Sequence, residues 1–419
     1  MSRALDVWFN ENKAGRLMQN NSGQLEFTYY PEYLNSKQPW PLSVSLKLQK
    51  ESFKDRITRP FFSGFLPDDM MRKRLAQKLK VSEKNPFALL EIVGGECAGA
   101  VSLYPEGKQP HREDPEDIQL LEEPDLDEVI KLLRRHPLLA GEKNVRLSLA
   151  GAQDKVGVRL IENKIALMRG GAPTTHILKP LITDRNSITD SIHNEFFCLQ
   201  LAQEVGIPAP RAEIRFASRE PFLLIERYDR ILENEKIIRL HQEDFCQALS
   251  IPPENKYERE GGPGIKSCLD VIQDYSIQPI PDQIKFLKII IFNYLIGNND
   301  AHGKNFSFLH QQGKVSSAPV YDLLSTAVYP DLDPKMAMKI GGKYKPEEIC
   351  LRHWLRLVSD TAAARKTLRK ELEDMPELTL KQAERLKNEL KTSGSNSPIF
   401  DAILTIIKTR AERILSLKE

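Results

Sequence analysis

Apolar and polar residues alternate over short runs at the start of the chain. The runs ALDVWF, RLM and LEFTYY are separated by the polar segments NENKAG and NNSG, a pattern typical of strands joined by tight turns. The segment PDDMMRKRLAQKL, which begins at Pro67, has acidic residues first and basic residues later, and this order suits the dipole of a helix. We therefore expect residues 1–105 to form a small α+β subdomain.

The composition changes over residues 106–136. Pro110, Pro115 and Pro124 lie within a mostly acidic stretch, which is typical of a solvated connection between domains. We expect this segment to be a linker together with a helix.

Strand-like alternation returns over residues 137–240. It is visible in VRLSLAGAQDKVGVRLIENKIALM, THILKP, EIRFA and PFLLIERYD, whereas SIHNEFFCLQLAQEVG has a helical period. Over residues 241–419 strands become rare, and helical periodicity continues to KQAERLKNELK and FDAILTIIKTRAERIL. A strand-rich region followed by a helical one predicts an α+β protein with two lobes.

The run IKFLKIIIFNYLI, from Ile284 to Ile296, is apolar at almost every position and is followed at once by GNNDAHGKNFSF. Ionisable groups beside a core are costly unless something pairs them. The polar segment is therefore either a satisfied turn or a functional site.

The composition is that of an ordinary folded protein. Of the 419 residues, 41% are hydrophobic and 28% are charged, whereas disordered chains are poorer in apolar residues and more one-sided in charge. Lys and Arg total 60 and Asp and Glu total 58, a net charge of +2. Nucleic-acid binding would therefore need a local basic patch.

The cysteines and the apolar runs bear on location. The five cysteines are scattered without CxxC spacing, which argues against a disulfide framework, a zinc site and a metal hydrolase. The N-terminal sequence MSRALDVWFNENK turns charged too early for a signal peptide. Lys285, Lys288 and Asn293 interrupt the longest apolar run, which is shorter than the ~20 residues of a membrane span. We expect a cytoplasmic protein that makes no membrane contact.

The polar segment after Ile296 contains two residue types that phosphoryl transfer requires. The reaction needs a carboxylate near the attacking hydroxyl and Mg²⁺ held by oxygen ligands. Asp300 and Asn305 are five positions apart (305 minus 300), which is the offset in the catalytic loop of protein kinases. Asp300 could take the proton of the acceptor hydroxyl and Asn305 could bind Mg²⁺, although the same spacing also occurs by chance.

Asp322 could supply a second metal ligand. It lies seventeen positions after Asn305 (322 minus 305), where kinases carry another metal-binding Asp. Its motif is YDLL rather than D-F-G. An open alternative is that Asp322 is the N-cap of a helix that begins with LLSTA.

Residues upstream could bind ATP. Lys179 ends the apolar run HIL, where it could meet a phosphate or simply extend its amine to solvent. The loop 148–155, SLAGAQDK, has a single glycine, Gly151, and does not match G-x-G-x-x-G; Ser148 could be an ordinary loop serine. A hinge that binds adenine could follow the apolar FLLI, at Glu226, Arg227 and Tyr228.

Several segments carry a family likeness. They are RLSLAGAQDK, TTHILKP, HNEFFCLQLA, IERYDR, QEDFCQALSIP, KYERE followed by GGPGI, LIGNNDAHGKNFS and PVYDLLS. Together with WFNENKAGRL and FLPD near the start, they make nearly the whole chain similar to the HipA family of serine/threonine-protein kinase toxins, the enzyme half of a bacterial toxin–antitoxin pair. The resemblance implies a protein-kinase-like, two-lobed α+β fold with an additional N-terminal subdomain.

The resemblance also implies a role for each candidate residue. Asp300 resembles the family's catalytic base, Asn305 and Asp322 its Mg²⁺ ligands, and Lys179 its ATP lysine. Further ATP contacts are implied for the phosphate loop (Ala150, Gly151, Ala152, Gln153, Asp154 and Lys155), the hinge (Glu226, Arg227 and Tyr228) and the catalytic segment (His302, Gly303, Lys304, Asn305, Tyr321 and Asp322). Ser148 resembles the serine that family members autophosphorylate, which inactivates the kinase by displacing that loop.

Cofactors and partners follow from the same resemblance. The cofactors are ATP and Mg²⁺. Family members phosphorylate an aminoacyl-tRNA synthetase, glutamyl-tRNA synthetase in the best-known case, which stalls translation and causes growth arrest and persistence. They bind a small helix-turn-helix antitoxin, HipB, so we expect DNA contact only through a HipB-like antitoxin.

The chain departs from the family pattern in LAGAQD, in NNDAHGKN and over Ala337–Lys345, so no DNA contact is assumed for the last of these. An alternative function is that of a catalytically weak corepressor, which acts with a helix-turn-helix antitoxin on operator DNA. Lys179, Asp300, Asn305 and Asp322 favour the kinase.

Overall fold

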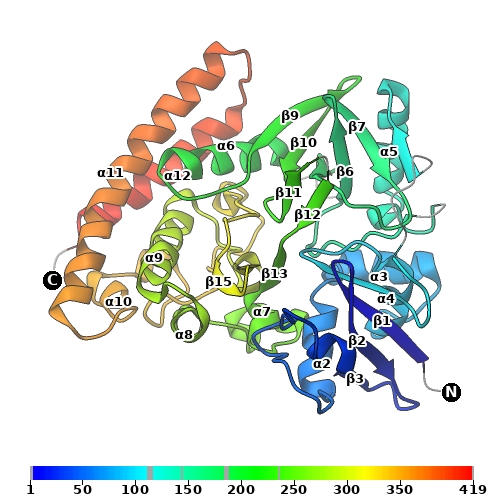
Figure 1. The fold of residues 1–419 in the computed structure, drawn as a ribbon. Coiled ribbons are helices and arrows are strands. Elements are labelled where there is room, and N and C mark those ends of the chain that lie inside the picture. Colours follow the sequence, from blue (N-terminus) through cyan, green and yellow to red (C-terminus); the bar gives the residue numbers. More distant parts are fainter. Residues whose placement is uncertain (1–2, 111–116, 143–144, 184–187, 235, 418–419) are drawn as a thin grey trace. The chain divides into compact units, whose positions relative to one another are not determined.

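The computed structural model describes residues 3–110, 117–142, 145–183, 188–234 and 236–417 (Figure 1). Contacts between Cα atoms divide the chain into two compact units. Unit 1 consists of Met1–Pro180, Arg215–Glu254 and Phe308–Val315, and unit 2 of Leu181–Ile214, Asn255–Ser307 and Ser316–Glu419. Because the chain alternates between the units, each unit brings together residues that are far apart in sequence.

Unit 1 begins with a four-stranded antiparallel sheet in the order β3-β2-β1-β4. The strands are β1 (Arg3–Phe9), β2 (Asn12–Gln19), β3 (Leu25–Tyr29) and β4 (Val101–Pro105), and the intervening helices are α1 (Pro31–Leu34), α2 (Asp55–Ser63), α3 (Asp69–Leu79) and α4 (Pro86–Val93). Leu5, Val7 and Phe9 alternate along β1 and are buried in one core with Phe61 and Phe87 of the helices. The strands and the helix predicted here are confirmed.

A second sheet has six strands in the order β5-β7-β6-β8-β10-β9. Its elements are β5 (Ile118–Leu120), β6 (Val156–Ile161), β7 (Lys164–Met168), β8 (His176–Pro180), β9 (Ala212–Ala217), β10 (Glu220–Glu226) and the helix α5 (Glu123–Leu133). A capping box between Glu122 and Asp125 starts α5, whose apolar residues Ile130 and Leu133 share a core with Leu178 of β8. The helix expected in the 106–136 segment is present, and residues 111–116 of the expected linker lie outside the described residues.

Shorter strands complete the sheet structure. They are the pair β11 (Arg230–Glu233) and β12 (Lys236–Arg239), and a sheet of order β13-β14-β15 built from β13 (His241–Asp244), β14 (Ser307–Gln311) and β15 (Lys314–Ser317). The short helix α7 (Phe245–Ala248) follows β13 directly.

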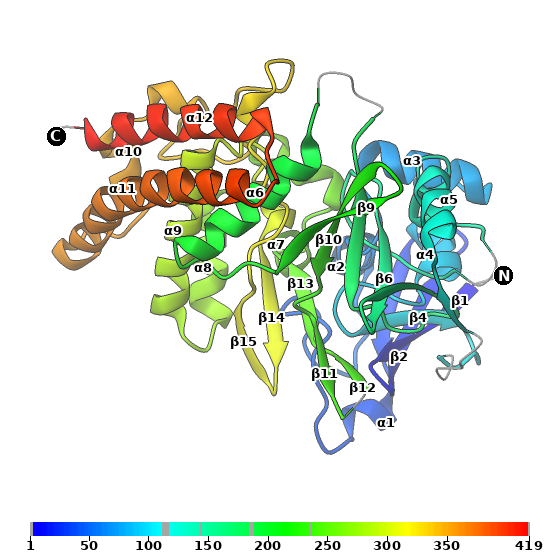
Figure 2. The ribbon, with the colours of Figure 1, turned by 90° about the horizontal axis from the view of Figure 1, so that it is seen from above.

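Unit 2 is largely helical. Its helices are α6 (Ser191–Glu204), α8 (Ile265–Tyr275), α9 (Pro279–Ile296), α10 (Leu351–Leu355), α11 (Ala362–Thr392) and α12 (Pro398–Leu415). α11 and α12 lie side by side (Figure 2) and both contact α6 and α9, which confirms the predicted C-terminal pair. α9 is buried at every residue from Ile289 to Ile296, because it is apolar on nearly all sides.

The remaining expectations concern cysteines and membranes. All five cysteines are free thiols, as the scattered spacing predicts. Within the described ranges, no helix combines the length and the apolar character that crossing a bilayer demands.

Candidate functional site

The end of helix α9 fixes where the polar loop begins. Gly297 follows the helix with a left-handed φ of 76°, a conformation that favours glycine. A Cβ atom at this position would lie 2.7 Å from the side chain of Ala327, so no larger residue fits without a shift. The polar residues that follow are therefore delivered from a rigid, buried helix.

Asn298 connects two of the predicted site residues. Its Oδ1 accepts a hydrogen bond from the backbone N–H of Asp300 at 3.2 Å, and its Nδ2 donates to the backbone oxygen of Asp322 at 3.4 Å and to Oδ1 of Asn293 at 2.8 Å. One buried amide thus brings Asp300 and Asp322 into the same small region of unit 2. Sequence reasoning missed Asn298, and the only local signal is its position two residues before Asp300.

Asp300 and Asn305 close a tight turn. Nδ2 of Asn305 donates to the backbone oxygen of Asp300 at 3.3 Å, and the backbone N–H of His302 donates to the same oxygen at 2.8 Å. Gly303–Asn305 form one turn of 3₁₀ helix. The side chain of Asp300 is exposed while Asn305 is buried, so the carboxylate faces solvent and the amide is held within the loop.

Asp322 has an unusual backbone conformation. Its φ is 54°, in the left-handed region, where a residue with a side chain is strained and often functional. No α-helix begins at Leu323: a 3₁₀ turn covers Thr326–Val328, and its N-cap residue is Ser325. The alternative that Asp322 caps a helix is therefore wrong.

Tyr321 links the segment before Asp322 to the loop that contains Asp300. Its hydroxyl donates to the backbone oxygen of Lys304 at 2.6 Å and lies 2.6 Å from Oγ of Ser307. The predicted residues His302, Gly303, Lys304, Asn305, Tyr321 and Asp322 are thus gathered in one loop cluster of unit 2.

Arg410 of α12 supports the loop from behind. Its guanidinium donates to the backbone oxygen of Tyr294 at 2.6 Å and to Oδ1 of Asn299 at 3.2 Å. Burial lowers the pKa of Arg410 from its usual value. Asn299 also donates to the backbone oxygen of Pro334 at 3.2 Å. Because these partners are distant in sequence, no local motif indicates them.

A further residue missed by the sequence reasoning contacts the carboxylate itself. The hydroxyl of Tyr257 donates a hydrogen bond to Oδ1 of Asp300 at 2.7 Å. Tyr257 belongs to the segment KYERE, whose residues indicate the family but no role at the site.

The predicted phosphate-binding residues lie in unit 1. Lys179 is on β8, opposite Leu223 of β10, and only 4% of it is exposed. The loop that contains Gly151 is held by several contacts. Lys155 Nζ donates to the backbone oxygen of Ala150 at 2.6 Å, Gln153 Nε2 donates to that of Pro180 at 3.3 Å, and Arg74 pairs with Asp154 at 3.3 Å. The contact between Gln153 and Pro180 places this loop beside the end of β8.

Ser148 is fully buried in the same region of unit 1. Its hydroxyl donates to the backbone oxygen of Phe65 at 2.8 Å, and its N–H donates to that of Glu96 at 2.8 Å. A phosphate could be added to this hydroxyl only after these contacts are released.

The predicted hinge follows β10. Glu226 is exposed and lies opposite His176 in the pairing of β10 with β8. The hydroxyl of Tyr228 donates to Oε1 of Gln242. The side chain of Arg227, by contrast, is buried and lies 2.9 Å from Glu96 and 2.8 Å from Asp229. Its guanidinium is engaged in these ion pairs and stabilises the fold. Any adenine contact at this position would therefore have to come from the backbone.

Arg227 is one of four buried charged residues, Glu96, Arg227, Asp229 and Arg230, which we name the ion cluster. Arg230 lies 2.7 Å from Glu96 and 2.8 Å from Asp229. Burial alone would raise the pKa of Asp229, but the two guanidinium groups hold it below its usual value. The two acids and two bases balance one another, as buried charges must.

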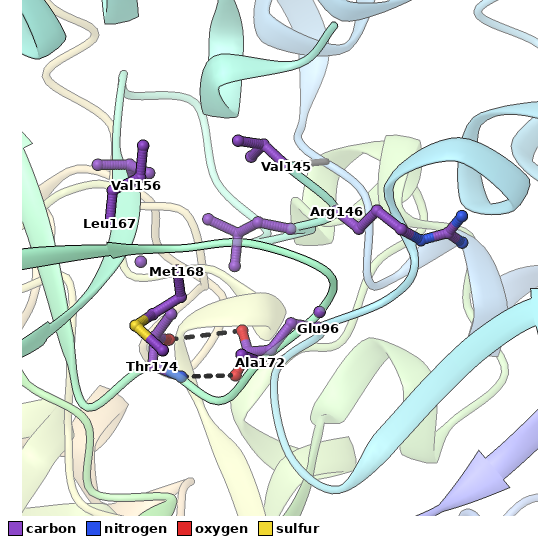
Figure 3. A pocket seen from close by; sticks show the side chains of 11 residues that line it. Glu96, Val145, Arg146, Val156, Leu167, Met168, Ala172 and Thr174 are labelled. Atoms are coloured by element: carbon purple, nitrogen blue, oxygen red, sulfur yellow. Dashed lines mark hydrogen bonds between the residues drawn. The ribbon is translucent and has the colours of Figure 1, made fainter. Parts of the chain in front are cut away.

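A small cavity adjoins Glu96 (Figure 3). Its volume is about 10 Å³, room for about one water molecule. Glu96 accepts from the N–H and the hydroxyl of Thr174 at 3.4 and 3.5 Å on its edge. This cavity is too small to hold a nucleotide.

Asn305 and Asp322 offer oxygen donors that suit a hard cation whose remaining ligands come from the phosphates of a nucleotide. In the described part of the chain, no three His, Cys, Asp or Glu residues cluster as a metal site. The Asp322 carboxylate and the Asn305 amide oxygen are the oxygen ligands that Mg²⁺ accepts when phosphates supply the rest.

Comparison with known proteins gives the class and then the family. The chain is 41% identical over 388 residues to Y4mE, a Sinorhizobium fredii protein whose name assigns it provisionally to the kinases. The aligned residues cover 92% of each chain. The serine/threonine-protein kinase toxin HipA of Shewanella oneidensis is 30% identical over 330 residues, which cover 74% of this chain and 72% of that protein.

The family models are those of the HipA N-terminal domain, which matches residues 5–104, and the HipA-like C-terminal domain, which matches residues 147–384. The chain belongs to the HipA family. A solved complex described as the Shewanella oneidensis toxin–antitoxin system HipA, HipB and its operator DNA contains a chain of the same fold, with a TM-score of 0.83, 24% identity, and coverage of 99% of this chain and 98% of that one. The expected family and its kinase-like α+β fold class are confirmed.

Proposed function

We propose that this chain is a serine/threonine protein kinase toxin that transfers the γ-phosphate of ATP to a protein. The observation that carries the proposal is that the side chain of Asn298 bonds to the backbone of both Asp300 and Asp322, while the Asn305 amide bonds to the backbone oxygen of Asp300. These are the residue types that phosphoryl transfer needs beside the acceptor hydroxyl and the metal. In a chance Asp-x4-Asn pair, the Asp would not be expected to share a buried amide with a second, left-handed Asp.

In this proposal Asp300 orients the acceptor hydroxyl and takes its proton as the hydroxyl oxygen bonds to phosphorus and the bond to ADP breaks. Asn305 and Asp322 would hold Mg²⁺, which when bound neutralises charge on the phosphates. Lys179 and residues 150–155 are the proposed phosphate contacts, and Glu226, Tyr228 and the backbone of Arg227 are the proposed adenine contacts. Residues 302–305 and 321–322 are the nucleotide contacts proposed for unit 2.

We also propose that Ser148 is an autophosphorylation site that switches the kinase off. A phosphoserine carries about −1.5 to −2 charge, which a fully buried position beside Phe65 cannot accommodate. Phosphorylation would therefore keep the segment out of its present place and disturb residues 150–155, which follow directly in the chain.

The test is the intact mass of the purified protein after incubation with Mg²⁺ and ATP. Wild type should gain one phosphate at Ser148, and Asp300→Gln should abolish the gain. Asp331→Asn is a suitable control, because Asp331 is an exposed acid in the same unit. An unchanged mass of the wild type, with ATP binding demonstrated by calorimetry, would refute the kinase.

The partners belong to the same proposal. The structural neighbour is described with HipB and operator DNA, which supports a HipB-like helix-turn-helix antitoxin as partner and DNA contact through it. An aminoacyl-tRNA synthetase, such as glutamyl-tRNA synthetase, is the proposed substrate, and the cytoplasm the proposed location. Labelled ATP added to a bacterial lysate, followed by identification of the labelled protein, tests the substrate.

The description of that neighbour also supports the second candidate, a catalytically weak corepressor. This function requires operator affinity of the antitoxin to change when the chain is added. A gel-shift assay with the antitoxin alone, and then with wild type or Asp300→Gln, separates it from the kinase.

A further inference from the structure

We propose that Tyr257 is a positioning residue for the Asp300 carboxylate; this inference deepens the kinase function proposed above and rests on it. The contact is direct, since the Tyr257 hydroxyl donates to Oδ1 of Asp300 at 2.7 Å. Both residues belong to unit 2, so the contact lies within one compact part of the molecule.

The ring of Tyr257 is held from more than one side. The ring of His302 meets it edge-on, with centroids 5.1 Å apart at 88°. The Arg259 guanidinium lies 5.1 Å from its centroid and is itself fixed by an ion pair with Asp333 at 2.5 Å. Lys256 Nζ lies 5.5 Å from the centroid. The phenol is therefore fixed between the catalytic loop and a charged pair, rather than free to rotate.

The backbone around Tyr257 is tied to the same loop. The N–H of Gly303 donates to the backbone oxygen of Lys256 at 3.3 Å, and the N–H of Glu258 donates to that of Ala337 at 3.3 Å. The N–H of Ala337 in turn donates to the backbone oxygen of Asn299 at 2.7 Å. Tyr257 and Asp300 are thus members of one hydrogen-bonded assembly, and their contact does not depend on a chance side-chain orientation.

A fixed donor on one carboxylate oxygen has a specific chemical effect. A carboxylate can accept hydrogen bonds at both oxygens. With Oδ1 engaged by Tyr257, rotation of the carboxyl group is restricted and Oδ2 is left for the acceptor hydroxyl. Reaction rates depend strongly on such orientation, because a pre-positioned group avoids the cost of ordering it in the transition state.

The same geometry allows a competing interpretation, in which the Tyr257 hydroxyl is itself the phosphoryl acceptor. Two features argue against it: the ring is fixed by His302 and Arg259, and a phosphate on this oxygen would remain beside the Asp300 carboxylate. Phosphotyrosine at position 257 in the mass spectrum would overturn the positioning role.

The kinetic test compares Tyr257→Phe with Tyr344→Phe. Phenylalanine keeps the ring and its contacts but removes the donor. Tyr344 is a matched control in unit 2, since its ring lies 5.0 Å from Lys339 Nζ and its hydroxyl has no hydrogen-bond partner among the described residues. We expect phosphate incorporation from labelled ATP to slow by about tenfold in Tyr257→Phe, as is typical for the loss of a hydrogen bond to a charged group. The half-saturating ATP concentration should stay unchanged, and Tyr344→Phe should behave as wild type.

A second measurement reads the contact without turnover. In protein labelled with 3-fluorotyrosine, the ¹⁹F resonance that disappears in Tyr257→Phe should shift in Asp300→Asn and stay in place in Asp331→Asn. An active wild type with an equally active Tyr257→Phe, or a ¹⁹F signal indifferent to Asp300→Asn, would refute the positioning role alone. A wild type that binds ATP but transfers no phosphate would refute the proposed kinase, whatever the ¹⁹F spectra show.

Discussion

Two groups of charged and polar residues, one in each unit, differ in how their charges are paired and exposed. The ion cluster of unit 1 is almost completely buried, and each acid in it faces two guanidinium groups. In unit 2, Asp300 is exposed, and its own hydrogen bonds are to neutral groups: the phenol of Tyr257, the amides of Asn298 and Asn305 and the backbone N–H of His302. Buried charges that satisfy one another stabilise a fold, whereas a charge whose neighbours are neutral can still act on a substrate.

The largest expected effect is a loss of catalytic rate that leaves the stability of the fold nearly unchanged. Asp300→Asn removes the charge but keeps an oxygen that can accept from Tyr257. The rate of phosphoryl transfer should fall by about 10² to 10⁴, as for the loss of a general base, while the free energy of unfolding changes by less than about 0.5 kcal/mol because the side chain is exposed. Incorporation of labelled phosphate from ATP measures the rate, and urea unfolding measures the stability. A large loss of stability would remove the contrast with the ion cluster.

The reverse is expected for the ion cluster. Glu96→Ala leaves Arg227 and Arg230 with Asp229 as their remaining acidic partner in the cluster, so the free energy of unfolding should fall by about 3–5 kcal/mol. Glu106→Ala is the matched control, since Glu106 pairs with Arg16 at 2.9 Å in an exposed position and should cost less than about 1 kcal/mol. Equal losses in the two variants, measured by urea unfolding, would show that burial does not set the strength of these pairs.

Acid should weaken the neighbourhood of the ion cluster through His241. Burial lowers the pKa of His241 from 6.5 to about 3, and the nearby His310 adds to this shift. The backbone oxygen of Leu42 and the Asp229 carboxylate oppose it. Because the folded pKa is depressed, the stabilisation is complete above pH 6.5 and is lost as the pH falls towards 3. Stability should decline by up to about 1.4 kcal/mol per pH unit below 6.5, and His241→Gln should flatten this slope in urea unfolding at pH 7, 6 and 5. An unchanged slope would contradict the assignment.

The smallest expected effect separates two residues of the loop. Asn305→Ala should weaken Mg²⁺-ATP binding by about tenfold, in the range typical of disturbed metal sites, whereas Asp300→Asn should leave the affinity unchanged. Isothermal titration of both variants checks this. A parallel loss of affinity in both would mean that Asp300 belongs to the metal site and not to the acceptor side.

What the sequence could predict depended on range. Alternation along β1 and the helical period of α9 are local, so the pattern indicates them. The pair Asp300 and Asn305 is also local, since both residues lie in one turn. The contact between Glu96 and Arg227 joins positions 131 residues apart, and Tyr257 reaches Asp300 over 43, so no spacing rule reveals either.

The alternative role for Asp322 failed for a local reason that the sequence does not display. A left-handed φ at Asp322 turns the chain away from a helix, and the hydrogen bond from Asn298, 24 residues earlier in the chain, to its backbone oxygen helps to hold that conformation. Recognition surfaces have no fixed residue spacing, so a local pattern in the sequence does not identify the substrate protein.

The burial of Ser148 has a consequence for timing. In the proposed switch, any agent that phosphorylates this hydroxyl must wait for the segment to leave the oxygen of Phe65, so the modification would proceed no faster than that local opening. The proposed switch would thereby contain a delay whose length is set by packing around Phe65. Substitutions there would change how long the protein stays unmodified while leaving every residue of the loop at Asp300 untouched.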